Sequence, residues 1–176
     1  MSIIRNTCAI LTGLFALISV AHANTSVIGL EIGKSTIEDV KSKYKINYSN
    51  PDASEWVIPY VIEPSDINIE GLNKVVALIK KDDGKLGGVV MFINKSRFDD
   101  LADSLQKKYT VLSSKRPRVG DAHVELLDGN TAIDLDAPHL SFEMTLLYIE
   151  KDIKDAIENQ SQQDAQQKKQ AEEDLL

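Results

Sequence analysis

The residues best suited to chemistry lie in two β-favouring segments, 122–126 and 131–135, which flank Leu127-Asp128-Gly129-Asn130. An Asp-Gly pair between such segments predicts a hairpin. Because side chains alternate between the two faces of a strand, five polar residues share one face of it: Asp121, His123, Glu125, Asp134 and Asp136. With Asp128-Gly129 as a two-residue turn, His123 pairs with Asp134 and Asp121 pairs with Asp136.

This polar face has two interpretations. Carboxylates opposite one another repel unless a positive charge neutralises them, and imidazole with carboxylate suits zinc or manganese. A divalent metal would then be held by His123, Asp134, Asp121 and Asp136. The simpler interpretation is a solvated face whose charge is balanced by the basic segment 115–118. We take the solvated face as the default, so no cofactor is expected and the metal site is the alternative.

Signatures of catalysis are missing from the sequence. Its single cysteine, Cys8, lies near the N-terminus, and no G-x-S-x-G elbow, H-E-x-x-H, phosphate loop or dinucleotide fingerprint is present. The acid pairs at 38–39 and 99–100 fall in predicted first turns of helices, where the helix dipole accounts for them. We therefore expect a protein without catalytic activity; a hydrolase that uses two of the 27 acids is the least favoured alternative.

A second candidate surface lies in the proline-containing segment 47–73, which holds Trp56, Tyr60 and Tyr48. Tryptophan and tyrosine dominate the energetic hot spots of protein interfaces, so these rings are candidates for binding a partner protein. The simpler alternative is that Trp56 covers one end of the sheet.

The elements that position these residues follow a weak internal repeat. Residues 34–40 (KSTIEDV) return at 95–101 (KSRFDDL), and each copy closes on Lys-Tyr before a β-favouring stretch. In both copies a serine, Ser35 or Ser96, precedes an acid by three residues, as in a capping box. Apolar residues follow at helical spacing. The sequence therefore predicts two helices.

Strands follow each predicted helix. Segments 75–79 and 89–93 flank an Asp-Gly joint, and the second helix leads to the 122–135 hairpin and an alternating strand at 141–149. In that last strand the residues predicted to share one face are Phe142, Met144, Leu146 and Tyr148. Helix then strands, twice, predicts an α+β fold with helices packed on an antiparallel sheet.

The predicted domain spans 24–157, with tandem units at 28–94 and 95–157. A C-terminal helix begins near Asp152 and has Ile153, Ala156 and Ile157 as its apolar side. Residues 158–176 form a polar tail rich in Gln, Lys and Glu, which is predicted to be helical or disordered.

Residues 1–23 have the pattern of a signal peptide. Arg5 precedes an apolar run at 7–20, and Ala21-His22-Ala23 is an A-x-A cleavage signal, so the mature chain is predicted to begin at Asn24. The apolar run is shorter than the ~20 residues that span a bilayer, so no stable membrane anchor is expected after cleavage. We expect a soluble protein of a Gram-negative periplasm, with an extracellular location as the alternative. The net charge of −7 argues against nucleic acid as a partner.

Residues 29–40 (GLEIGKSTIEDV) resemble the start of a class of small exported bacterial domains. These begin with a short apolar strand, a glycine, a Ser/Thr cap and an acidic first turn ending in valine. The class includes the outer-membrane-assembly lipoproteins of the SmpA/OmlA (BamE-like) type and the β-lactamase-inhibitor-protein-like fold. The resemblance implies a non-enzymatic scaffold that binds another envelope protein, in envelope maintenance or as an inhibitor. A small ligand- or metal-binding protein that uses the hairpin face is the alternative function.

Overall fold

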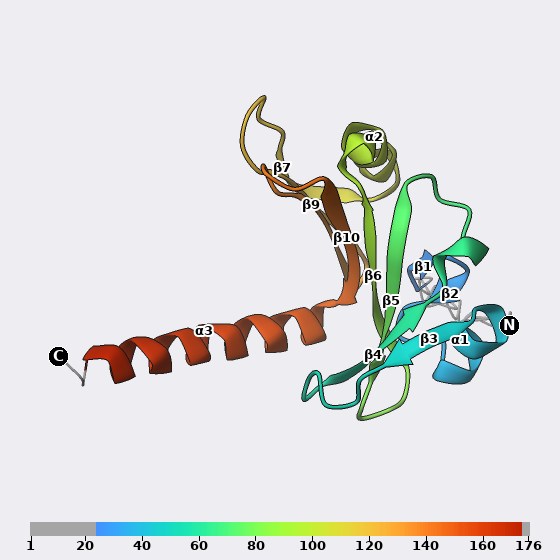
Figure 1. The fold of residues 1–176 in the computed structure, drawn as a ribbon, viewed down its shortest axis with the longest axis horizontal. Helices are drawn as coiled ribbons and strands as arrows, with labels where there is room; N and C mark the ends of the chain where they lie inside the picture. The colour runs from blue at the N-terminus through green and yellow to red at the C-terminus, as the bar shows by residue number, and fades with distance from the viewer. Residues whose placement is uncertain (1–23, 174–176) are drawn as a thin grey trace, which may run out of the picture.

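The computed structural model describes residues 24–173, so the predicted signal peptide and its cleavage point lie outside the described residues. An eight-stranded antiparallel sheet forms the body of the molecule (Figure 1). Its strands are β3 (Ile46–Ser49), β4 (Val57–Ile62), β5 (Leu72–Lys80), β6 (Leu86–Asn94), β7 (Thr110–Lys115), β8 (Ala122–Asp128), β9 (Thr131–Ala137) and β10 (Glu143–Glu150). The helices are α1 (Ile37–Lys43), α2 (Phe98–Lys108) and α3 (Lys151–Glu173).

The strand order is β3-β4-β5-β6-β10-β9-β8-β7, so the first four strands follow the order of the chain and the second four follow it in reverse. Helix α1 precedes the meander β3 to β6, helix α2 precedes the meander β7 to β10, and the last strands of the two meanders pair with each other. This confirms the predicted α+β fold, with two helix-then-strands units and a C-terminal helix. The region 47–73 supplies β3 and β4, a strand pair with an irregular register.

One face of the sheet carries the main hydrophobic core, and we call it the core face. Val40 of α1 and Phe98, Ala102 and Leu105 of α2 are buried against it. Figure 1 shows both helices on the same side of the sheet. A short N-terminal hairpin, β1 (Ser26–Val27) and β2 (Leu30–Glu31), packs there too, since Val27 and Leu30 belong to the same core.

The N-terminal segment is tied to both units of the sheet. Thr25 donates a hydrogen bond of 2.9 Å to the Asp128 carboxylate at the β8–β9 turn. In the first unit the Gly33 N–H donates to the Leu86 carbonyl at 2.7 Å. Residues ahead of α1 therefore hold the two meanders together at one end.

Two predicted helix caps are wrong in detail. The capping box of α1 joins Thr36 to Asp39, one residue later than predicted. Ser35 is already used, because its hydroxyl accepts from the Glu31 N–H at 2.9 Å. At the second helix Asn94 caps a 3-10 turn, Lys95–Arg97, by accepting from the Ser96 N–H, and α2 follows this turn without a side-chain cap.

The last strand and the tail also refine the prediction. Met144, Leu146 and Tyr148 are buried on the core face as predicted, but Phe142 is 91% exposed because β10 begins only at Glu143. The polar tail is helical as far as Glu173, and every residue from Ser161 to Glu173 is exposed. In Figure 1 this helix, drawn in orange and red, runs away from the sheet on the side opposite α1 and α2.

The start of α3 packs on the second face of the sheet, which we call the outer face. Ile153 is buried there with Val57, Ala132 and Ile149. Gly87 makes the contact possible: it is the extra residue of a β-bulge in β6, since Leu78 pairs with Gly88 and Ile79 with Leu86. A Cβ atom on Gly87 would lie 2.2 Å from Cδ1 of Ile153.

We therefore expect Gly87→Ala to loosen the attachment of α3. The added methyl must displace both Ile153 and the side chain of Lys80, whose Cγ would lie 2.8 Å away. Overpacking of this kind lowers the free energy of unfolding by about 1–3 kcal/mol. Urea denaturation followed by Trp56 fluorescence measures the loss. The exposed Lys81→Ala is the control, and equal stability of the two variants would contradict this packing.

Candidate functional site

The polar hairpin face predicted from the sequence lies on the outer face of the sheet. The actual register pairs His123 with Asp136 and Glu125 with Asp134, so the predicted pairing of His123 with Asp134 is wrong by two residues. The turn residues are Gly129 and Asn130, and Gly129 has a φ of 58°. Positive φ is required at the first central position of a type II′ turn, where glycine is favoured. A two-residue slip leaves every side chain on its predicted face.

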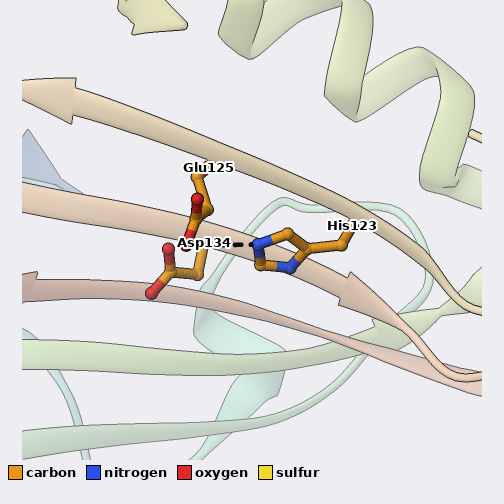
Figure 2. Close-up of side chains that lie close together, drawn as sticks. All are labelled: His123, Glu125 and Asp134. Atoms are coloured by element: carbon orange, nitrogen blue, oxygen red, sulfur yellow. Dashed lines mark ion pairs between the residues drawn. The ribbon is translucent and has the colours of Figure 1, made fainter. Parts of the chain in front are cut away.

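His123 is held by two carboxylates. Its Nδ1 lies 2.5 Å from Oδ1 of Asp136. Its Nε2 lies 3.4 Å from Oε1 of Glu125, the ion pair drawn in Figure 2. Burial alone would lower the pKa of His123. Hydrogen bonds and charge from Asp136 and Glu125 outweigh that effect and raise the pKa above the ordinary 6.5.

Asp134 is the buried member of the group, with a side chain only 7% exposed. Its Oδ2 accepts a hydrogen bond of 2.8 Å from Nζ of Lys154, on the first turn of α3. Burial lowers the pKa of Lys154, but the hydrogen bond and charge of Asp134 raise it overall. Oδ1 of Asp134 has no hydrogen-bond partner among the described residues and almost no contact with solvent. One oxygen of this carboxylate is therefore unsatisfied.

Asp121, a predicted metal ligand, and Arg116, in the basic segment predicted to balance the charge of the hairpin, make contacts outside the polar group. Asp121 is outside the group, because it precedes β8 and its Oδ1 accepts from the His139 N–H at 2.7 Å. Arg116 pairs with Asp103 of α2 at 2.7 Å instead of facing the hairpin carboxylates. The neutralising cation is Lys154, which the sequence analysis missed. The adjacent Ile153, predicted to pack, was the only sequence signal for it.

The three aromatic residues predicted to bind a partner do not form one surface. Trp56 is half-buried and packs beside Val57 and Ile153 on the outer face. Tyr60 packs against the main core on the other face. Tyr48, on the edge strand β3, is 61% exposed. Of the three, Trp56 lies beside a concave surface on the outer face.

That surface is a groove between the outer face and α3. Pro59 and Leu78 of the sheet, Trp56, and Ile157 and Gln160 of α3 are among the residues that line it, and it encloses about 640 Å³. Beside it, directly paired residues of four adjacent strands form a row that we call the apolar strip: Val61, Val76, Val90 and Leu147. Leu147 pairs in turn with Asp134, so the apolar strip runs directly into the polar group.

A second set of apolar side chains is exposed at the other end of the sheet. Val119, Leu140 and Phe142, in the loops that connect β7 to β8 and β9 to β10, are at least 75% exposed. Figure 1 shows these loops at the end of the sheet remote from the start of α3. Phe142 was predicted to share one strand face with Met144, Leu146 and Tyr148, so this exposed surface was not expected from the sequence.

Within residues 24–173, no helix is long and apolar enough to cross a membrane. No protein-family model matches the sequence, and no curated protein or solved structure matches it either.

The raised pKa of His123 makes stability depend on pH. Because the folded-state pKa exceeds the unfolded value, this histidine stabilises the fold fully below about pH 6.5, and that contribution is lost as pH rises through the folded-state pKa. In a buffer containing EDTA, we expect the free energy of unfolding to fall across this range. In His123→Gln the fall should shrink, whereas in the control His139→Gln it should persist. An NMR titration midpoint for His123 at or below 6.5 would contradict the assignment.

Proposed function

We propose that the protein is a non-catalytic binding module that docks a partner protein on the outer face of its sheet. The observation that carries this proposal is the groove beside the apolar strip. Its floor and one wall are apolar, yet among the described elements only the first turns of α3 pack on this face. The apolar strip is half-buried at Val61, Val90 and Leu147 and buried at Val76. Contiguous apolar surface rimmed by polar groups is typical of protein interaction sites.

The charge around the groove indicates the chemistry of the partner. Glu125, Asp134 and Asp136 lie at one end of the apolar strip, and Glu55 and Asp164 border the groove. Lys154 offsets only part of this charge. A segment that presents apolar side chains flanked by Lys or Arg complements this arrangement, since such charges steer association and fix register. We propose an exported, envelope-located partner of this kind, in keeping with the predicted signal peptide and the resemblance of residues 29–40.

A charge placed in the apolar strip tests the proposal. We expect Val90→Asp to weaken partner binding about 30-fold, the effect of losing an interface hot spot worth about 2 kcal/mol. Crosslinked partners captured from an envelope extract are identified with the wild-type protein, and affinity is then measured with the purified partner. Circular dichroism and the melting temperature establish that the variant is folded.

Phe142→Asp is the matched control, because that side chain is exposed on the remote loops. It should leave the affinity unchanged. If Phe142→Asp abolishes binding while Val90→Asp retains it, the partner docks on the loops and the proposed surface is wrong.

A further inference from the structure

The group of His123, Glu125 and Asp134 has the composition and closeness of a metal site. One donor atom of each residue lies within 4.8 Å of the others. Figure 2 shows the imidazole from β8 directed at the carboxylate of Glu125, with that of Asp134 beside it. Tetrahedral zinc, with bonds of 2.0–2.2 Å, separates its ligand atoms by roughly 3.3 Å. Side-chain rotations that move each donor atom by about 1 Å therefore bring the three atoms to the separations that zinc requires.

Asp136 prepares the histidine for this role. A carboxylate bonded to one nitrogen of a metal-binding histidine fixes the proton there and leaves the other nitrogen free to coordinate. Asp136 is placed in this way, at 2.5 Å from Nδ1. With the proton on Nδ1, the Nε2 lone pair faces Oε1 of Glu125 at 3.4 Å. A zinc ion bound to Nε2 would take the place of the proton through which the protonated histidine contacts Glu125.

Asp134 supplies an independent indication. Its side chain is more than nine-tenths buried, and Oδ1 has neither a hydrogen-bond partner nor appreciable contact with solvent. Buried acceptors without a partner are rare and costly. A metal ion bound by this carboxylate would satisfy the orphaned oxygen.

Lys154 supplies the local positive charge when no metal is bound. Its ammonium lies 2.8 Å from Oδ2 of Asp134 and 4.0 Å from Oε1 of Glu125. It therefore sits against two of the same carboxylates that an ion would bind. Its single positive charge is shared by the carboxylates of Glu125 and Asp134, so a divalent ion neutralises this pair more completely.

We propose that His123 Nε2, Glu125 and Asp134 bind zinc, that Asp136 orients the histidine, and that zinc and the Lys154 ammonium compete for the carboxylates. Since Lys154 follows Ile153 on the first turn of α3, zinc binding releases one of the contacts that hold this helix to the sheet. The proposal goes beyond partner binding and stands without it.

Calorimetric titration with zinc chloride tests the site, using purified protein that carries no affinity tag. We expect one ion to bind per chain with micromolar affinity. His123→Ala should abolish binding, and Asp136→Asn, which keeps all three ligands, should weaken it about 10- to 100-fold. His139→Ala, which removes the histidine of the remote loop, is the control and should bind as the wild type does.

Competition is tested with Lys154→Met, which keeps the apolar stem of the side chain and removes its charge. We expect zinc to bind this variant about tenfold more tightly, on the order of 1.4 kcal/mol, and to raise its melting temperature more than that of the wild type. Circular dichroism without zinc checks that each variant is folded. No heat at millimolar zinc, or undiminished binding by His123→Ala, would overturn the site. Unchanged affinity in Lys154→Met would overturn the competition.

Discussion

The pairing of β6 with β10 is the constraint on which the rest of the structure depends. Each unit ends on a strand with one unpaired edge, and seven residue pairs from Glu143↔Asn94 to Ile149↔Gly88 join these edges. The two four-stranded meanders thereby become one sheet whose central strands are hydrogen-bonded on both sides. Unpaired edges of long apolar strands invite aggregation, so the pairing protects the apolar edges of β6 and β10.

The same pairing also decides how the two faces are used. Because directly paired residues lie on the same face of a sheet, Met91 opposite Leu146 and Ile93 opposite Met144 continue one core across the junction. Helices α1 and α2 therefore cover a single face. Among the described elements the outer face receives only the start of α3, which leaves its apolar strip and its polar group next to each other.

Much of this fold is predictable from local patterns. Helical spacing and strand alternation predict both helices, the β5–β6 and β8–β9 hairpins and the buried side of β10, because these depend on residues close in sequence. The order of the strands could not be predicted in this way. β6 and β10 are about fifty residues apart in the sequence, and their pairing depends on how the two units pack together. Ser35 does not cap the helix because its hydroxyl already accepts a hydrogen bond from the Glu31 N–H. The spacing of residues along a helix does not predict this contact.

The residues of the candidate site also divide into those that local patterns predict and those that depend on tertiary packing. Alternation alone places His123, Asp134 and Asp136 on one face, and that assignment is confirmed even though the turn lies one residue further along than predicted and the pairing is shifted by two residues. Asp121 was misplaced because the strand begins after it, and Lys154 was missed because its partner lies 20 residues away on another element. The register of the hairpin is set by the turn at Gly129, whose φ angle is positive. The contact of Lys154 with Asp134 depends instead on where α3 packs against the sheet.

The exposed length of α3 has a mechanical consequence. A 23-residue helix is about 35 Å long, and its buried attachment to the sheet is confined to the turns around Ile153. A rod fixed at one end amplifies rotation, so a tilt of about 20° at Ile153 moves the far end by about 10 Å. A change at the carboxylates beneath Lys154 that tilted α3 would therefore displace its far end by much more than the site itself moves.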